Sequence, residues 1–192
     1  MELERKTIAS DEEYLRQVSK PVDFNKSDWQ EAAKKLDEFC KSYDNCLAMA
    51  SVQLGIPLRM IYLKKTDLNR LEEDYNEEKI MINPKVINSY GLTTYWEACA
   101  SCLTNTGLVE RPYKIELEYY DIEGKKYKEV FEGFASTVLS HEIDHLDGIL
   151  HIDIANEILQ MEKEERKAWR KTHPYKIIRK DGEYKHPKKD KN

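Results

Sequence analysis

The sequence predicts a single α+β domain, on three observations. The chain has 192 residues, which is enough for one domain with its own hydrophobic core. Hydrophobic residues make up 40% of the chain and charged residues 35%, as is typical of a globular rather than a disordered protein. Helical and strand patterns are mixed along the chain without a repeated β-α-β unit, which favours α+β over α/β.

The first half of the chain contains one clear helix signal. Ser27 and Gln30 resemble a capping box. Apolar residues then recur at helical spacing, which predicts an amphipathic helix over 28–42. The other segments of this half are expected as a short helix at 11–18, strands at 60–63 and 80–87, and an exposed acidic segment at 66–79.

The second half contains a β-hairpin signal followed by helical patterns. Ile115, Leu117 and Tyr119 alternate with glutamates, which is the period-2 pattern of a half-buried strand. The turn residues at 121–124 then lead into a second strand over 126–131. The remaining elements are expected as a helix over 134–146, closed by a glycine, and a last helix from about 154 to 172.

Composition limits where the protein works and what it binds. No apolar run is long enough to span a bilayer, and the N-terminus lacks the apolar core of a secretory signal. We therefore expect a cytoplasmic protein without membrane contact. Thiols stay reduced in that compartment, so the cysteines are expected to be metal ligands or core residues rather than disulfides. They are Cys40, Cys46, Cys99 and Cys102.

The charge is distributed unevenly. The net charge of the chain is −5, but the segment 166–192 has eleven Lys and Arg residues against three acidic residues. That segment therefore carries +8, and the rest of the chain carries −13. A basic tail on an acidic body indicates either contact with a polyanion or simple solvation.

The most informative motif is HEIDH at 141–145. His141 and His145 are spaced i and i+4, so on a helix both imidazoles reach one metal ion. Glu142 lies beside them and can approach a water on that ion without being a ligand. Taken alone the motif is only moderately specific, because it also occurs in unrelated helices whose histidines are surface residues.

Two histidines need a third ligand, and the sequence offers candidates on both sides. Upstream, Cys99 can supply a thiolate, a good ligand for zinc or ferrous iron. Cys99 and Cys102 also form a CxxC pair, typical of a zinc knuckle or a redox pair, but a second CxxC and a β-α-β context are both missing. The downstream candidates are His151, Glu157, Glu162, Glu164 and Glu165.

With these motifs the chain resembles the peptide deformylases, from about residue 11 to 153. EACAS at 97–101 stands where the family has EGCLS, and HEIDH stands where it has HExDH. GLVERP at 107–112 matches the family stretch G-x-V-x-R-P without a gap from 97. CLAMASVQLG at 46–55 matches the family motif GxGxAAxQxG in part.

The resemblance implies a function for the chain. It implies a metal-dependent amidohydrolase that removes the formyl group from the N-terminal formylmethionine of newly synthesised proteins and releases formate. It also implies antiparallel β-sheets packed around a central HExxH helix, with a C-terminal helix. We expect a catalytic domain over 1–172 and a basic tail over 173–192, which is either solvated or in contact with ribosomal RNA.

The resemblance also implies a role for individual residues. The metal ligands would be Cys99, His141 and His145, with ferrous iron as the expected metal and zinc or nickel as substitutes. The catalytic groups would be Glu142 as general acid and base, with the Gln53 amide and the Ala100 backbone N–H as oxyanion donors. The supporting residues would be Glu97 and Arg111 as an ion pair and Phe134, Thr137 and Val138 as the wall of the methionine pocket.

Several positions depart from the family pattern. Cys46, Ala48 and Ala98 replace glycines, which permit special backbone angles and close approach of a substrate. These departures leave open a divergent deformylase-like protein with altered substrate or lost activity. A zincin-type metallopeptidase is a further alternative, and it requires a metal ligand downstream of His145.

Overall fold

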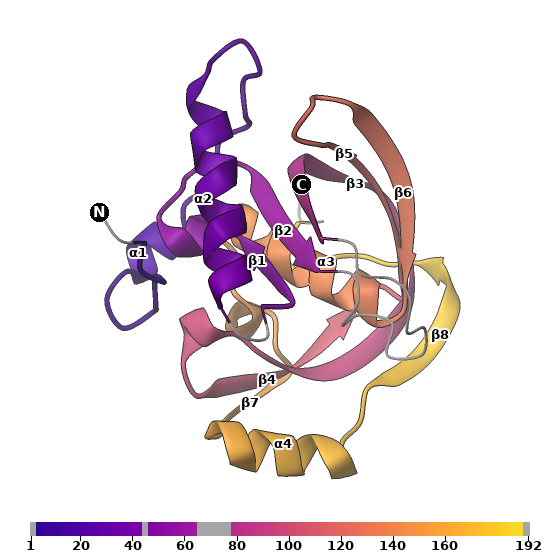
Figure 1. Ribbon diagram of the computed structural model, residues 1–192. Helices are drawn as coiled ribbons and strands as arrows, with labels where there is room; N and C mark the ends of the chain where they lie inside the picture. The colour runs from indigo at the N-terminus through magenta and orange to yellow at the C-terminus, as the bar shows by residue number, and fades with distance from the viewer. Residues whose placement is uncertain (1–2, 44–45, 65–77, 190–192) are drawn as a thin grey trace.

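The computed structural model describes residues 3–43, 46–64 and 78–189 (Figure 1). The helices in these ranges are α1 (Glu12–Leu15), α2 (Asp28–Ser42), α3 (Phe134–Leu146) and α4 (Lys163–Thr172). The strands are β1 (Ala48–Ala50), β2 (Met60–Lys64), β3 (Glu78–Ala98), β4 (Asn105–Arg111), β5 (Lys114–Tyr120), β6 (Lys126–Glu132), β7 (Glu157–Gln160) and β8 (Lys176–Glu183). Short 3-10 segments are η1 (Ser51–Leu54), η3 (Ala100–Cys102) and η4 (His151–Asp153).

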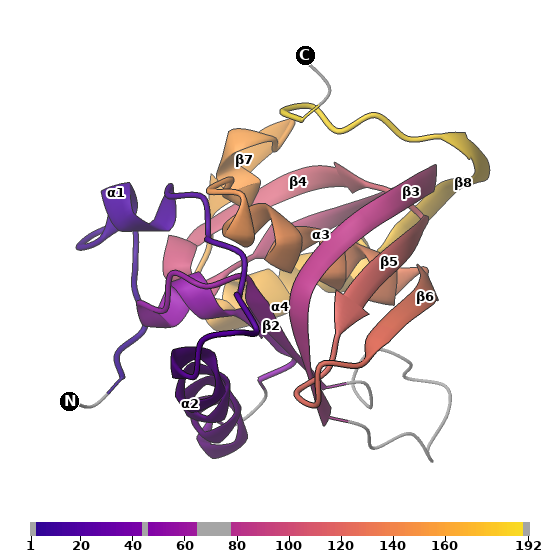
Figure 2. The same cartoon turned by 90° about the horizontal axis from the view of Figure 1, so that it is seen from above.

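The long strand β3 organises the sheet. It pairs antiparallel with β2, β4, β5 and β8 along different parts of its 21 residues. The sheet is extended by β1 beside β2, by β6 beside β5 and by β7 beside β4. The strands curve around α3, which lies at the centre of the molecule (Figure 2). The predicted α+β fold, with an antiparallel sheet around the helix that carries HExxH, is confirmed.

Helix α3 is buried because its apolar side packs on the hairpin β5–β6. Leu139, Ile143 and Leu146 are at most 2% exposed and belong to one core cluster with Ile115 and Leu117 of β5. Alternate side chains of β5 are buried, as its period-2 pattern predicted, and Ile115 and Leu117 belong to the same core cluster as α3. Helix α2 covers a second cluster on the other side of β2. None of the helices in the described part of the chain is long and apolar enough to cross a bilayer.

Most predicted elements are confirmed. The helix predicted at 11–18 is shorter, Glu12–Leu15, and Ser27 makes no side-chain capping hydrogen bond. The larger corrections lie in the C-terminal region. The helices predicted over 28–42 and 134–146 begin and end as predicted, and the strands near 60, 80, 115 and 126 are present. The single helix predicted from 154 to 172 is wrong. Residues 157–160 form β7 because their backbone pairs with the edge of β4, and α4 begins only at Lys163. Most of the acidic segment predicted at 66–79 lies outside the described residues.

The basic C-terminal segment contributes a strand to the sheet. Lys176–Glu183 form β8, which pairs with the middle of β3. This pairing needs Gly91, whose φ is +75° and whose absent side chain leaves room for the β8 backbone. A Cβ at Gly91 would lie 2.7 Å from the carbonyl oxygen of Arg179 and 2.8 Å from that of Lys180. The domain boundary at 172 stays a prediction, although β8 is part of the same sheet.

We predict that Gly91→Ala lowers the free energy of unfolding more than Gly124→Ala. Both glycines have a positive φ, so each substitution costs about 1–2 kcal/mol of backbone strain. Only at Gly91 does the new methyl group also meet the β8 backbone, which adds about 1–3 kcal/mol. Urea unfolding of the two variants measures the difference. Equal losses would show that β8 does not pack closely on Gly91.

Candidate active site

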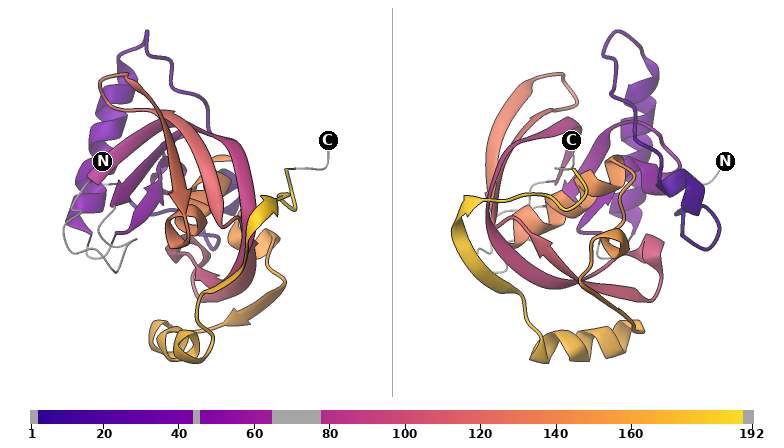
Figure 3. Two further views of the ribbon diagram at one scale, coloured as in Figure 1. Left: turned by 90° about the vertical axis from the view of Figure 1, so that its right-hand side faces the viewer. Right: turned by 180° about the vertical axis from the view of Figure 1, so that it is seen from behind.

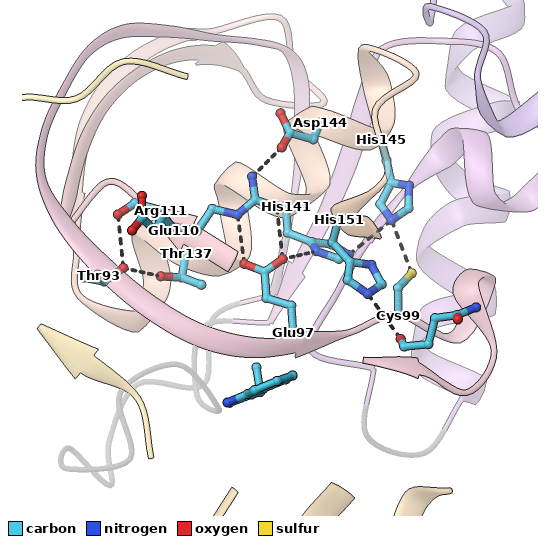
Figure 4. A network of polar contacts seen from close by, with 12 residues as sticks. Thr93, Glu97, Cys99, Glu110, Arg111, Thr137, His141, Asp144, His145 and His151 are labelled. Atoms are coloured by element: carbon cyan, nitrogen blue, oxygen red, sulfur yellow. Dashed lines mark hydrogen bonds and ion pairs between the residues drawn. The ribbon is translucent and has the colours of Figure 1, made fainter. Parts of the chain in front are cut away.

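Helix α3 and the end of β3 bring three candidate metal ligands together (Figure 4). His141 and His145 lie one helical turn apart on α3, and Cys99 lies between β3 and η3. The Sγ atom of Cys99 is 3.2 Å from Nε2 of His145, which is 3.2 Å from Nε2 of His141. One ligand atom from each residue lies within 4.8 Å of the others. A thiolate with two imidazoles is a donor set that fits zinc or ferrous iron.

Buried charges orient His141 from behind. Arg111, whose side chain is 1% exposed, donates from Nε and Nη2 to the two carboxylate oxygens of Glu97, at 2.8 and 3.0 Å. Glu97 Oε2 lies 2.8 Å from Nδ1 of His141. Burial alone would raise the pKa of Glu97, but Arg111 and His141 together lower it below its ordinary value. Ionised Glu97 accepts the Nδ1 proton of His141 and leaves its Nε2 lone pair for a metal.

Asp144 completes this buried network from the other side of Arg111. It accepts a hydrogen bond from Nη1 of Arg111, and its side chain is 2% exposed. Burial raises the pKa of Asp144, and the charges of Arg111, His186 and Lys189 reverse that effect and lower it. The predicted ion pair of Glu97 with Arg111 is thus confirmed, and it is buried rather than a surface pair. Sequence reasoning did not single out Asp144, although it lies inside the HEIDH motif.

The surroundings of Cys99 favour its thiolate, the form that binds metals. The hydrogen bond from Cys102 and the proximity of His145 lower the pKa of Cys99 well below its ordinary value. The same contact raises the pKa of Cys102, so the neighbouring thiol remains protonated. The turn that joins them is closed by the Cys102 N–H donating to the Cys99 carbonyl at 2.9 Å. The surroundings therefore favour the thiolate at Cys99 and the thiol at Cys102.

The polar side chains beside the donor group are held by backbone contacts. Glu142 is 6% exposed, and its Oε2 accepts the backbone N–H of Ala50 at 2.8 Å. Burial raises the pKa of Glu142 above its ordinary value. Gln53 accepts the same N–H through Oε1 and donates from Nε2 to Cys99 Sγ at 3.2 Å and to Ser101 Oγ at 3.1 Å. The amide of Gln53 thus points at the donor group.

A cavity of about 770 Å³ opens above these residues. The donor residues Cys99 and His141 line it, as do Glu142 and Gln53. Its wall combines strand β1, the N-terminal half of α3 and parts of β3 and α4. Of the residues singled out from sequence, the wall includes Phe134, Thr137, Val138 and Ala100.

The downstream ligand candidates do not join the donor group. His151 is buried, and its ring centroid lies 5.6 Å from that of His141. Its Nε2 lies 3.2 Å from the carbonyl oxygen of Asn105, and burial lowers its pKa to about 4. Among the described residues, the group of converging ligand atoms contains Cys99 instead. This arrangement disfavours the zincin alternative, which needs a ligand after His145.

Comparison with known proteins places this site in a family. A family model described as polypeptide deformylase matches residues 5–161. The chain belongs to the peptide deformylase family. The peptide deformylase of Bradyrhizobium diazoefficiens is 34% identical over 80% of this chain and 88% of its own length. That of Rhizobium meliloti is 38% identical over 75% of this chain and 80% of its own.

Solved structures of peptide deformylases share the fold. A probable peptide deformylase from synechococcus phage S-SSM7 has a TM-score of 0.67 and 33% identity, and the match covers 79% of this chain and 99% of that one. A class I type b peptide deformylase from Acinetobacter baumannii, solved with Met-Ala-Ser bound, has a TM-score of 0.68 and 26% identity, covering 80% and 98%. The predicted family and its metal dependence are confirmed, and the chain is an enzyme of this class.

Proposed function

We propose that this enzyme removes the formyl group from the N-terminal formylmethionine of newly synthesised proteins. The observation that carries the proposal is the buried group of Cys99, His141 and His145, with Glu142 and Gln53 beside it on the floor of a cavity. The Acinetobacter relative supports the substrate class, since Met-Ala-Ser is a tripeptide with the free N-terminal methionine that deformylation leaves. Formate release from formyl-Met-Ala-Ser tests the proposal directly.

Cys99, His141 and His145 would hold one divalent metal ion, for which we propose ferrous iron, with zinc or nickel as substitutes. The hydrogen bond of His141 Nδ1 to Glu97 and the thiolate form of Cys99 suit this role. When bound, such an ion lowers the pKa of a water molecule and polarises the formyl carbonyl.

Glu142 would transfer the proton during hydrolysis. Its carboxylate accepts a proton as water adds to the formyl carbon, and it returns that proton to the amine nitrogen when the carbon–nitrogen bond breaks. The products are formate and a free N-terminus. The Ala50 N–H fixes Glu142 Oε2 at 2.8 Å, so the carboxylate keeps its direction through both transfers. Because its carboxylate stays in one place, Glu142 can serve first as the base and then as the acid.

Gln53 and Ala100 would stabilise the oxyanion formed at the formyl carbon. The Nε2 of Gln53 already points toward Cys99, and its Oε1 is held by Ala50, so the amide is oriented before substrate binds. The backbone N–H of Ala100 lies at the start of η3 beside the same cavity. Phe134, Thr137 and Val138 would receive the methionine side chain.

The departures from the family glycines affect the cavity wall rather than the backbone. Among the described non-glycine residues, only Asn83 and Leu103 have a positive φ. Cys46, Ala48 and Ala98 therefore adopt ordinary backbone angles, and all three line the cavity. Their side chains add volume there, which favours altered peptide preference over lost chemistry. Turnover of formyl peptides that differ after methionine measures this preference.

We predict that Glu142→Gln retains the metal but releases formate from formyl-Met-Ala-Ser at least about 100-fold more slowly than the parent enzyme. The three proposed ligands are unchanged, while the amide cannot accept the proton. Metal content by atomic absorption, measured on the same preparations, is the control. Parental turnover by the variant would exclude Glu142 as the general base.

We predict that Cys99→Ser loses most of the bound metal, whereas Cys102→Ser retains one equivalent. Cys99 lies among the converging ligand atoms, and Cys102 only donates a hydrogen bond to it. Metal stoichiometry of the two purified variants distinguishes the residues. The reverse result would move the metal to Cys102 and remove the support for the roles of Gln53 and Ala100.

We also propose that the enzyme works in the cytoplasm and contacts ribosomal RNA through exposed basic residues of α4 and β8. Lys171, Lys176 and Lys180 are exposed there. We predict that Lys176→Glu with Lys180→Glu weakens co-sedimentation with ribosomes at low salt, because fewer phosphate contacts form. Lys34→Glu with Lys35→Glu on α2 is the matched control. Equal sedimentation of both double variants would contradict the proposal.

A further inference from the structure

The segment after β8 returns to the central helix. We call residues 184–189 the C-terminal strap. Figure 3 shows it leaving β8 and running back toward α3. Its first residue, Tyr184, is 9% exposed, donates its backbone N–H to the Ser89 carbonyl at 3.2 Å and its hydroxyl to the Glu110 carbonyl at 3.0 Å. The strap is therefore docked on the sheet before it reaches α3.

Two side chains of the strap, His186 and Lys189, contact the carboxylate of Asp144. Nε2 of His186 lies 3.0 Å from Oδ1 of Asp144 and 3.1 Å from Oδ2, the oxygen that also accepts from Arg111. Nζ of Lys189 lies 2.7 Å from Oδ1 of Asp144 and 2.6 Å from Oδ2 of Asp147, just beyond the end of α3. Both strap side chains are partly buried, with 13% and 30% exposure, and Asp144 is almost completely buried. Such contacts restrict a carboxylate more than surface ion pairs do.

The contacts continue from Asp144 to a proposed metal ligand. Asp144 accepts from Arg111, Arg111 donates to Glu97, and Glu97 lies 2.8 Å from Nδ1 of His141. Asp144 also directly precedes His145 on α3. The strap thus contacts Asp144 at one end of this buried network, and Glu97 contacts His141 at the other end. It lies beyond residues 5–161, the part of the chain that the family model matches.

We propose that His186 and Lys189 are positioning residues for the metal site. They fix the carboxylate of Asp144, so that its Oδ2 keeps Arg111, and through it Glu97 and His141, in the orientation that binds metal. This inference rests on the proposed metal site of Cys99, His141 and His145. It assigns the basic C-terminal segment a role within the active site scaffold.

The strap itself offers matched controls. Lys185 and Lys188 are exposed neighbours of the two positioning residues, and replacing both removes at least as much positive charge from the strap as replacing His186 and Lys189. Lys189→Arg keeps a charged group with several donors, so it can still bridge Asp144 and Asp147. These variants separate a specific contact with Asp144 from a general effect of charge.

The test uses the full-length protein loaded with Co²⁺, whose visible absorption reports the ligand geometry. One equivalent bound by the parent protein is measured first. The double variant His186→Gln with Lys189→Gln is then compared with Lys185→Gln with Lys188→Gln. We expect the first to release Co²⁺ to a chelator about tenfold faster and to change its absorption band, as loss of support behind a ligand does. The control and Lys189→Arg are expected to match the parent.

Steady-state kinetics on formyl-Met-Ala-Ser add a second readout. The strap residues do not line the 770 Å³ cavity, so kcat should fall while KM stays within about twofold. Parental Co²⁺ release by the double variant, or equal effects of the control, would overturn the inference. If the double variant does not fold, His186→Gln and Lys189→Gln are measured separately, and their Co²⁺ release and kcat are compared with those of the parent. A parent that binds no Co²⁺ would instead overturn the proposed function, and the inference with it.

Discussion

The guanidinium of Arg111 lies between two carboxylates, Glu97 and Asp144, and is 1% exposed. Water cannot solvate these groups, so each charge depends on the others for its stability. Removing one partner from a buried pair costs about 3–5 kcal/mol, because it leaves an uncompensated charge. That cost fixes the end of β3, the end of β4 and the last turn of α3 relative to one another. The spacing of the proposed metal ligands follows from these fixed positions.

The three elements reach Arg111 for separate reasons. Strand β3 pairs Glu97 with Gly107 of β4, which sets the register of the Cys99 turn relative to Arg111. Helix α3 is held by its apolar side against β5, so its opposite side turns Asp144 and the histidines toward the β3–β4 pair. Gly107 has no side chain, and a Cβ there would lie 2.8 Å from Ala155 and 3.2 Å from the His151 ring. Close packing around the charges therefore needs this glycine.

Local sequence patterns were sufficient to predict the direction of side chains within a single helix or strand. The helix spacing of His141 and His145 predicted that both face one ion, and the alternation in β5 predicted which residues face the core. The pairing of β7 with β4 and of β8 with β3 depends on long-range contacts that leave no local signal, so both strands were missed. The partners of Asp144 were missed for the same reason, since His186 lies 42 residues away in sequence. Cys99 could be distinguished from Cys102 only through the family resemblance.

The charge of the C-terminal segment illustrates why a count of residues is a poor guide to function. As sequence, the Lys and Arg residues after 166 form one basic stretch. In the structure they divide by environment, because Lys176 and Lys180 face solvent whereas Lys189 meets two carboxylates at the end of α3. A solvated lysine acts through long-range, salt-screened attraction, while a partly buried one acts through fixed geometry. The same residue type is therefore free for surface contacts in one place and fixed against buried carboxylates in another.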